Sequence, residues 1–286
     1  MKERLPHWFK QKIPDPEIIH AMKGFLDGLN LHTICESAQC PNAGECFSRK
    51  TATFLILGDV CTRRCTFCAV KKGIPIPVDQ DEPQHVLEAT KKLNLRYVVV
   101  TSVTRDDLAD GGASQFAKTI EVLHEQRNGM MVEVLIPDFN GSTEALKAVV
   151  ESQPHVLNHN IETVPSLYAE VRPGADYNRS LDLLFEVRGM DPAIVTKSGF
   201  MLGLGENRDE VIAVMSDLRE ANCDMLTIGQ YLRPSEKHRP VVSFVTPEEF
   251  SEYERIGMEM GFAEVASAPL VRSSFRAAEL YSKVKR

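Results

Sequence analysis

Six of the seven cysteines in this 286-residue chain fall within one stretch of 34 residues. An iron–sulfur cubane held by three thiolates keeps one iron without a protein thiolate, and that iron can bind another group. The six cysteines form two triplets, each one ligand short of four, and we therefore expect two iron–sulfur sites. The triplets are CxxxxCxxxxxC at Cys35, Cys40 and Cys46, and CxxxCxxC at Cys61, Cys65 and Cys68.

Disulfides and structural zinc are the alternative uses of closely spaced cysteines. Disulfide frameworks belong to small secreted chains, whereas this chain is long and its first ten residues, MKERLPHWFK, lack the apolar stretch of a secretory signal. Structural zinc favours four ligands in paired CxxC-like units. Two cysteine triplets of unequal spacing are therefore explained better by iron–sulfur clusters than by disulfides or structural zinc.

Composition is typical of an intracellular enzyme. Hydrophobic residues make up 43% and charged residues 26% of the chain, and no apolar run approaches the roughly 18 residues of a membrane helix. We expect a cytoplasmic protein without a membrane partner. Because no Gly/Ser-rich or Pro-rich linker divides the sequence, we expect one catalytic domain over residues 51–261. An extension over 1–50 carries the first triplet, and a second extension covers 262–286.

Short apolar runs rich in β-branched residues alternate with longer amphipathic stretches, as in βα units around a parallel sheet. Such units curl into a TIM-like barrel, so we predict an α/β fold with a partial (β/α)6 barrel. The expected strands are residues 53–57, 96–101, 131–136, 156–160, 194–198 and 225–229, with a possible further strand at 262–266. The expected helices include residues 83–93, 114–125, 141–151, 180–188 and 208–221.

The segments after the expected strands are polar and contain glycine, for example GDVCTRRCTFC after the first and SVTRDDLADGG after the second. In a parallel barrel these loops share the rim at the carboxyl ends of the strands. A cluster bound after the first strand would therefore face the polar groups of the other loops. That arrangement is typical of an active site.

The second triplet resembles a known signature. Cys61, Cys65, Phe67 and Cys68 form the CxxxC-aromatic-C pattern that the radical S-adenosylmethionine (SAM) superfamily carries after the first strand of its partial barrel. The resemblance implies a 4Fe-4S cluster whose fourth iron is chelated by the amino and carboxylate groups of SAM. It also implies reductive cleavage of SAM to a 5′-deoxyadenosyl radical, which the protein aims.

Over roughly residues 30–280 the chain resembles the lipoyl synthase family within that superfamily. The first triplet matches the family's auxiliary-cluster motif. Residues 272–277, RSSFRA, resemble its RSSYxA motif, whose second serine, Ser274 here, supplies an oxygen ligand to the auxiliary cluster. Phe275 stands at the tyrosine position, so any role of a phenolic hydroxyl is absent. From the residues alone, the segment also fits a helix start capped by serine.

A serine ligand suits a cluster that gives up sulfide. Thiolate is the softer and more usual ligand of iron in these clusters. An alkoxide from Ser274 is therefore a plausible weak point at which the cluster opens.

The resemblance implies lipoyl synthesis. Sulfur from a sacrificial auxiliary 4Fe-4S cluster is inserted at carbons 6 and 8 of an octanoyl-lysine, and two SAM molecules are used. The implied substrates are octanoylated lipoyl carrier domains, namely E2 subunits of 2-oxoacid dehydrogenases and the glycine cleavage H protein. A ferredoxin or flavodoxin electron donor and an iron–sulfur carrier that rebuilds the cluster are the implied partners. The acidic body argues against nucleic acid.

Polar residues at the carboxyl ends of the strands and in the loops that follow are candidates for binding SAM. Hydroxyls after the second strand could bond the methionyl amino group, polar groups after the fourth could engage the ribose or amino acid end, and cations could pair with the carboxylate. A structural hydrogen bond or ion pair is the alternative for each. In that order the candidates are Thr101 and Ser102, then Asn158, Asn160 and Glu162, then Arg172 and Lys197.

Four further polar or reactive residues are expected to have structural rather than catalytic roles. Asp106, Asp107 and Asp110 are expected to cap a helix or to neutralise an arginine, because this chemistry moves hydrogen atoms rather than protons. Cys223 is expected to be a small buried residue.

The two ends of the chain are basic. The first 12 residues carry four Lys/Arg against one acidic residue, residues 272–286 carry five against one, and the net charge of the whole chain is −7. These ends could steer an acidic carrier domain toward the site, or they could be solvated tails.

Three other functions remain open from the sequence. One is another two-cluster radical enzyme of the biotin-synthase or methylthio-transferring kind, which should lack the upstream triplet together with a terminal RSS motif. The second is a non-catalytic metal-binding module, and the third is an inactive relative that binds both clusters.

Overall fold

The computed structural model describes residues 5–10, 15–126 and 129–284. Its core is an eight-stranded sheet in the order β1-β2-β5-β6-β7-β8-β9-β10, parallel except for the antiparallel pair β1–β2. A separate ribbon pairs β3 with β4 in parallel. The strands are β1 (His32–Thr33), β2 (Thr53–Ile56), β3 (Val60–Cys61), β4 (Lys71–Lys72), β5 (Tyr97–Ser102), β6 (Met131–Leu135), β7 (Val156–Asn158), β8 (Val195–Leu202), β9 (Met225–Gln230) and β10 (Glu264–Ser267).

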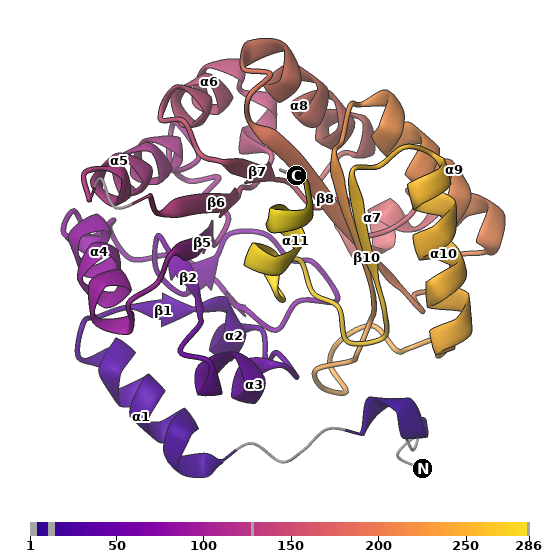
Figure 1. Ribbon diagram of the computed structural model, residues 1–286, viewed down its shortest axis with the longest axis horizontal. Helices are drawn as coiled ribbons and strands as arrows, with labels where there is room; N and C mark the ends of the chain where they lie inside the picture. Colours follow the sequence, from indigo (N-terminus) through magenta and orange to yellow (C-terminus); the bar gives the residue numbers. More distant parts are fainter. Residues whose placement is uncertain (1–4, 11–14, 127–128, 285–286) are drawn as a thin grey trace.

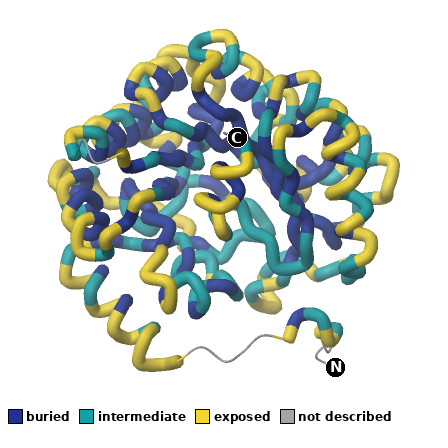
Figure 2. Tube along the Cα trace, viewed as in Figure 1, coloured by how far each residue is buried: buried dark blue, intermediate teal, exposed yellow. Residues whose placement is uncertain are grey.

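Helices surround the sheet, so the strands lie inside a ring of helices (Figure 1) and are mostly buried (Figure 2). All six expected strands and the possible seventh are present, which confirms the predicted α/β partial barrel. Because β10 pairs with β9, the sheet continues past residue 261. The α-helices are α1 (Pro16–Asp27), α2 (Ile34–Ser37), α3 (Ala43–Ser48), α4 (Glu82–Leu93), α5 (Ala113–His124), α6 (Thr143–Glu151), α7 (Tyr168–Val171), α8 (Tyr177–Met190), α9 (Arg208–Glu220), α10 (Pro247–Glu259) and α11 (Ala277–Val284).

Local sequence signals set several helix starts. Asn207 and Thr246 each accept a hydrogen bond from the backbone of the residue three positions later, and the carboxylates of Glu210 and Glu249 in turn accept one from the backbone amide of the cap residue. These two capping boxes satisfy amide groups that the helices α9 and α10 would otherwise leave unpaired. Within the described ranges, none of the helices has both the length and the apolar character needed to cross a membrane.

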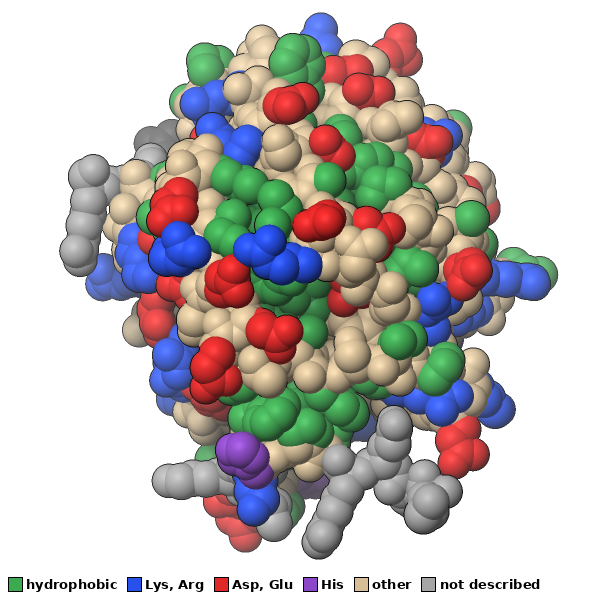
Figure 3. Space-filling model, turned by 90° about the vertical axis from the view of Figure 1, so that its right-hand side faces the viewer, with side chains coloured by type: hydrophobic (Ala, Val, Ile, Leu, Met, Phe, Trp, Pro, Cys, Tyr) green, Lys and Arg blue, Asp and Glu red, His purple; other side chains and the backbone are tan. Residues whose placement is uncertain are grey.

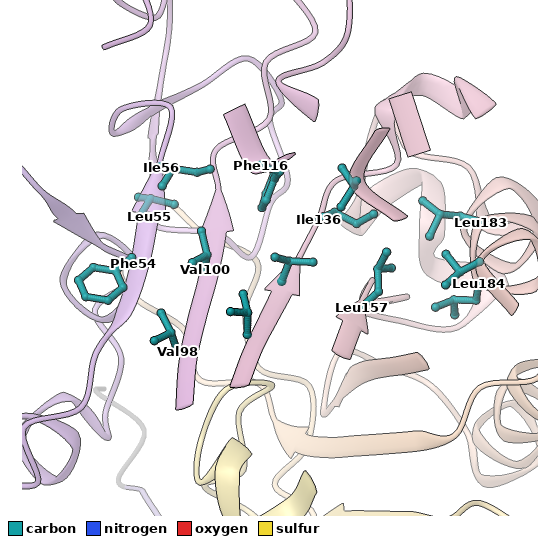
Figure 4. Close-up of a cluster of buried hydrophobic side chains, with 14 of the residues drawn as sticks. Phe54, Leu55, Ile56, Val98, Val100, Phe116, Ile136, Leu157, Leu183 and Leu184 are labelled. Atoms are coloured by element: carbon teal, nitrogen blue, oxygen red, sulfur yellow. The ribbon is translucent and has the colours of Figure 1, made fainter. Parts of the chain in front are cut away.

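Side chains of an inner strand alternate between two environments. Val98 and Val100 of β5 are fully buried in the same hydrophobic cluster as Phe116 of α5 (Figure 4). The intervening Val99 and Thr101 face the barrel interior, where they line a cavity. One face of the sheet therefore provides the core beneath the helices, and the other provides the site.

Helix α11 closes the end of the barrel at which the strands begin. Its Leu280 and Tyr281 pack with Val156, Val195 and Met225, which are the first residues of β7, β8 and β9. The ribbon of α11 accordingly lies at the centre of the ring in Figure 1. Apolar contacts therefore seal this end of the barrel.

A buried ion pair lies just inside this floor. Lys197 Nζ of β8 is 2.8 Å from Glu133 Oε1 of β6, and neither side chain is exposed. The Tyr97 hydroxyl donates to Glu133 Oε2 at 2.6 Å. The attraction and this added hydrogen bond offset the desolvation of two charges, whereas removal of one partner would leave the other charge buried and uncompensated.

We expect Lys197→Met to lower the free energy of unfolding by about 3–5 kcal/mol, and the double variant Lys197→Met/Glu133→Gln to recover much of that loss. Urea unfolding at matched iron content measures both. Arg208→Ala is the control, because the Arg208–Glu252 pair, at 2.8 Å, joins exposed side chains, and its loss should cost less than about 1 kcal/mol. Equal effects of Lys197→Met and Arg208→Ala would contradict the prediction.

Candidate active site

One cavity of about 930 Å³ extends along the barrel interior, from the first residues of β2 and β5 to the loops at which the strands finish. Residues from the ends of β5, β8 and β9 line it, as do segments from both ends of the chain. The structure therefore brings both cysteine triplets, the aromatic residue of the second motif and the C-terminal serine to one space. These residues are Cys35, Cys40, Cys46, Cys61, Cys65, Cys68, Phe67 and Ser274.

Two short helices position the first triplet. The Thr33 hydroxyl caps α2 by accepting a hydrogen bond from Glu36 N at 3.3 Å, and Cys35 lies in this helix. Cys40 N then donates to Cys35 O at 2.9 Å, which turns the chain, and Cys46 follows in α3. The turn between the helices thus gives the three thiols a common cavity wall.

Ser274 reaches this wall from the other end of the chain. The Thr53 hydroxyl donates to Ser274 Oγ at 2.8 Å, and Thr53 also hydrogen-bonds Cys35. Thr53 is the first residue of β2. A single residue of the sheet therefore links the C-terminal serine to a thiol of the first triplet.

The second triplet lies on the ribbon and the loop that follows β3. Cys61 ends β3, and Thr66 N donates to Val171 O of α7 at 3.0 Å. His238 Nε2 lies 3.2 Å from Cys68 O. Because the loop backbone is tied to two neighbouring segments, its three thiols are fixed at the cavity surface.

Burial keeps most of these thiols protonated in the absence of metal. It raises the pKa of Cys35 and Cys68 to about 12 and that of Cys46 to about 11, and it also raises the pKa of Cys65. A metal must therefore displace protons before the thiolates bind it. In the described part of the chain, no three His, Cys, Asp or Glu side chains converge closely enough to hold one metal ion.

Beside the second triplet, the cavity presents polar atoms without partners. Ser102 Oγ and Arg172 Nε are buried and have no hydrogen-bond partner among the described residues. Glu162 has a left-handed backbone (φ 68°), and its amide donates to Gly199 O at 3.0 Å. Burial raises the pKa of Glu162 against the opposing charge of Arg172. Strained backbone and unpaired polar groups together are typical of a ligand site, and these groups fit the amino acid end of SAM.

Two other SAM candidates also line the cavity. Thr101 Oγ1 donates to Leu135 O at 2.8 Å, which leaves its lone pairs available as acceptors. Asn160 Nδ2 donates to Glu162 Oε1 at 3.0 Å.

Asn158 and Lys197, however, do not line the cavity. Lys197 pairs with Glu133, and Asn158 Nδ2 lies 3.5 Å from the same carboxylate. The expected fifth strand ended at residue 198, whereas β8 continues to Leu202. Lys197 therefore lies within the strand, deeper than the rim, and the structure corrects the expectation that these two side chains contact SAM.

The four residues for which we expected structural roles have them. The aspartates bond arginines or cap α5, and Cys223 is fully buried. The contacts are Asp106 with Arg63 at 2.9 Å, Asp107 with Arg105 at 2.9 Å, and Asp110 with the amides of Gly112 and Ser114, both at 2.9 Å.

Sequence reasoning gave no role to two residues beside Ser274. Ser273 Oγ donates to Asn160 Oδ1 at 2.9 Å, so adjacent serines contact opposite sides of the cavity. Arg272 also lines the cavity, and burial lowers its pKa despite the nearby Cys40 and Glu162. The one sequence feature that could have pointed to Arg272 and Ser273 is their position within the RSSF motif.

The charge at the C-terminal end is largely engaged within the molecule. Arg276 Nη2 lies 3.0 Å from Glu45 Oε1, and Lys283 Nζ lies 2.6 Å from Glu264 Oε1. Arg276 and Lys283 are therefore not free to steer an acidic partner, as was expected of this end of the chain. Most of the N-terminal cations, Lys2, Arg4 and Lys12, lie outside the described residues.

Comparison with known proteins first gives the class. The family model described as "Radical SAM superfamily" matches residues 55–218. Among solved structures, methylornithine synthase (PylB) has a TM-score of 0.54 at 15% identity, with 85% of this chain and 73% of that chain covered. HydG, a maturase of the [FeFe]-hydrogenase, has a TM-score of 0.55 at 14% identity, with 88% and 56% covered. The chain is a radical SAM protein, and this class implies a 4Fe-4S cluster and SAM.

Curated relatives give the particular family. Lipoyl synthase of Caldanaerobacter subterraneus subsp. tengcongensis is 60% identical over 277 residues, covering 97% of both chains. That of Caldicellulosiruptor saccharolyticus is 55% identical and covers 98% of both, and residues 1–40 match the N-terminal domain of lipoyl synthase. The chain belongs to the lipoyl synthase family. The prediction that it is an enzyme, a sulfurtransferase, is confirmed by these relatives.

The raised pKa values predict slow alkylation of the cysteines in cluster-free protein. Iodoacetamide reacts with the thiolate, so labelling of Cys35 and Cys68 should be slow at pH 7 and should accelerate up to pH 10. Peptide mass spectrometry resolves the two sites, and an unfolded sample gives the reference rate. Labelling at pH 7 as fast as in the unfolded chain would contradict the prediction.

The Ser273–Asn160 hydrogen bond predicts a coupling between the C-terminal segment and the SAM side of the cavity. Ser273→Ala removes one hydrogen bond to Asn160, so we expect the KM for SAM to rise by about fivefold, with iron content unchanged. Ser282→Ala is the matched control, because its hydroxyl bonds only within α11, to Glu279 O. Loss of iron at an unchanged KM would show that Ser273 instead supports a cluster.

Proposed function

We propose that this chain inserts two sulfur atoms, at carbons 6 and 8 of a protein-bound octanoyl-lysine, to form the lipoyl group. The observation that carries the proposal is that both triplets and Ser274 line one cavity whose interior is largely apolar. A substrate chain between two clusters needs such a space. The lipoyl synthase names of the relatives support the same reaction.

The second triplet would hold the cluster that binds SAM, and the first triplet with Ser274 would hold a second, auxiliary 4Fe-4S cluster. When bound, these groups supply a 5′-deoxyadenosyl radical on one side of the cavity and sulfide on the other. The donor sets fit this assignment, because the three thiols of each triplet line the same cavity and Ser274 Oγ is linked through Thr53 to Cys35 of the first triplet. The proposed ligands are Cys61, Cys65 and Cys68, and Cys35, Cys40, Cys46 and Ser274.

The chain's own residues would orient the reactants and keep out water. Ser102 and Arg172 have free polar atoms at the cavity, and they would bind the amino acid end of SAM together with Glu162. Leu135 and Phe200 are apolar lining residues that would hold the octanoyl chain. Fixed contacts with the octanoyl chain raise the probability that its reacting carbon approaches the radical productively. Exclusion of water suppresses side reactions.

We further propose octanoylated lipoyl carrier domains as substrates, those of E2 subunits and of the glycine cleavage H protein. A ferredoxin or flavodoxin would donate electrons, an iron–sulfur carrier would rebuild the auxiliary cluster, and the reaction would take place in the cytoplasm. We also propose that the expected division of the chain, into a barrel over residues 51–261 and an extension at each end, is a division of function. In this division, the extensions together supply the proposed auxiliary site.

The test is anaerobic turnover after cluster reconstitution. With SAM, dithionite and an octanoyl-lysine peptide, we expect 5′-deoxyadenosine together with a two-sulfur gain in peptide mass. SAM cleavage without sulfur gain would assign another substrate. The absence of cleavage by the fully loaded protein would overturn the proposed function.

Ser274→Ala tests the oxygen ligand in the same assay. Sulfur insertion should fall by on the order of tenfold or more because the auxiliary cluster loses a ligand, while 5′-deoxyadenosine formation persists. Ser282→Ala should leave both products unchanged. Full sulfur insertion by Ser274→Ala would remove Ser274 from the proposed machinery.

A further inference from the structure

The segment that carries the second triplet has a charge unlike the rest of the chain. Residues 60–78 contain four Lys/Arg and no acidic residue, although the net charge of the chain is −7. Arg63 is buried and paired with Asp106 and Asp138. The other three cations, Arg64, Lys71 and Lys72, are exposed.

This segment forms a wall between the cavity and solvent. The three cysteines of the second triplet line the cavity, whereas Arg64, between them in sequence, is exposed on the outside. The β3–β4 ribbon pairs Cys61 with Lys72, and Lys72 Nζ donates to Cys65 O at 2.9 Å. One surface cation, Lys72, is therefore tied directly to the backbone of residues proposed to bind the SAM-binding cluster.

An apolar tip continues from the cations. Ile74 is 94% exposed and Ile76 is 65% exposed, the two highest values among the large hydrophobic residues that the structure describes as exposed. Highly exposed isoleucines that follow cations in one short segment combine apolar and charged surface, a combination typical of a protein–protein contact. We define the cluster-loop face as Arg64, Lys71, Lys72, Ile74 and Ile76.

The side of the molecule on which α9 and α10 lie differs from this face. On the side where α9 and α10 lie, Lys/Arg and Asp/Glu side chains are interspersed among hydrophobic patches (Figure 3). The Arg208–Glu252 pair joins those two helices. Within the cluster-loop face, Lys71 pairs with Asp59 at 2.5 Å, whereas Lys72 donates to a backbone carbonyl rather than to a carboxylate.

We propose that the cluster-loop face docks an acidic one-electron carrier protein, which reduces the cluster behind it. The inference rests on the proposed function, because the cluster must receive an electron before SAM is cleaved. Three observations select this occupant: the cations favour an acidic surface, the isoleucines provide a small apolar contact, and the segment itself holds the proposed cluster ligands. Redox partners commonly use such small, weak interfaces, with charge setting the association rate.

The test compares two reductants in the holoenzyme. The variant Lys71→Glu/Ile74→Glu reverses one charge and removes one apolar contact. With an octanoyl-lysine peptide, we expect 5′-deoxyadenosine formation driven by reduced flavodoxin to fall on the order of tenfold at low ionic strength. The rate driven by dithionite, which needs no docking surface, should stay within about twofold of the unmodified protein.

The matched control is Lys147→Glu/Phe185→Glu. Lys147 is an exposed lysine paired with Glu151 on α6, and Phe185 is 57% exposed on α8. The control should leave both rates unchanged. Arg64→Gln, a milder change of charge alone, should lower only the flavodoxin-driven rate and to a smaller extent.

Three results would overturn the proposal. The first is an unchanged flavodoxin-driven rate in the double variant. The second is an equal loss with dithionite, which would make the face a structural support of the cluster. The third is a loss seen only when an octanoylated carrier domain replaces the peptide, which would assign the face to the substrate protein. Absence of sulfur gain by the unmodified enzyme with dithionite would instead overturn the proposed function, independently of docking.

Discussion

The active site depends on the meeting of the two ends of the chain at the open edge of the sheet. Asn42 Nδ2 donates to Leu270 O at 2.7 Å, and Thr53 Oγ1 donates to Ser274 Oγ at 2.8 Å. The exposed pair between Arg276 and Glu45 adds little to this contact. Part-buried hydrogen bonds and the packing of α11 against the floor therefore hold the first triplet and Ser274 together.

Burial at this junction has a thermodynamic cost that bound metal would offset. Buried polar atoms without partners are unfavourable, and burial disfavours the thiolate forms of Cys35 and Cys68. Metal binding replaces the thiol protons and satisfies the thiolates, so its free energy adds to the stability of the fold. The Glu133–Lys197 pair is different, because its two charges compensate each other within the protein.

The sequence predicted the order of the strands and the grouping of the cysteines, because β-branched periodicity and ligand spacing are local patterns. The sequence did not predict how far from the rim of the barrel a given strand residue lies. Alternation along a strand tells which face Lys197 occupies but not how far β8 extends beyond it, and β8 continues to Leu202. The ion-pair partner of Lys197 could not be predicted either, since Glu133 lies within an apolar strand. A lysine and a glutamate inside two apolar runs on either side of β7 are a signal of a buried pair.

The RSSF segment was predictable only by its resemblance to a family motif. Its two serines contact residues 221 and 113 positions earlier in the chain, and no local pattern encodes contacts of that range. The opposite directions of Ser273 and Ser274 follow from the sheet and loops that they meet, not from their own sequence.

The position of α11 has a consequence for the order in which the site can be completed. This helix and the adjoining serines follow both cysteine triplets by more than 200 residues in the chain, yet they close both the floor and one wall of the cavity. A barrel without this segment in place has neither its lower seal nor the oxygen atom of Ser274. Docking of the segment therefore narrows the access of iron and sulfide to the cysteines, and its undocking would widen that access again.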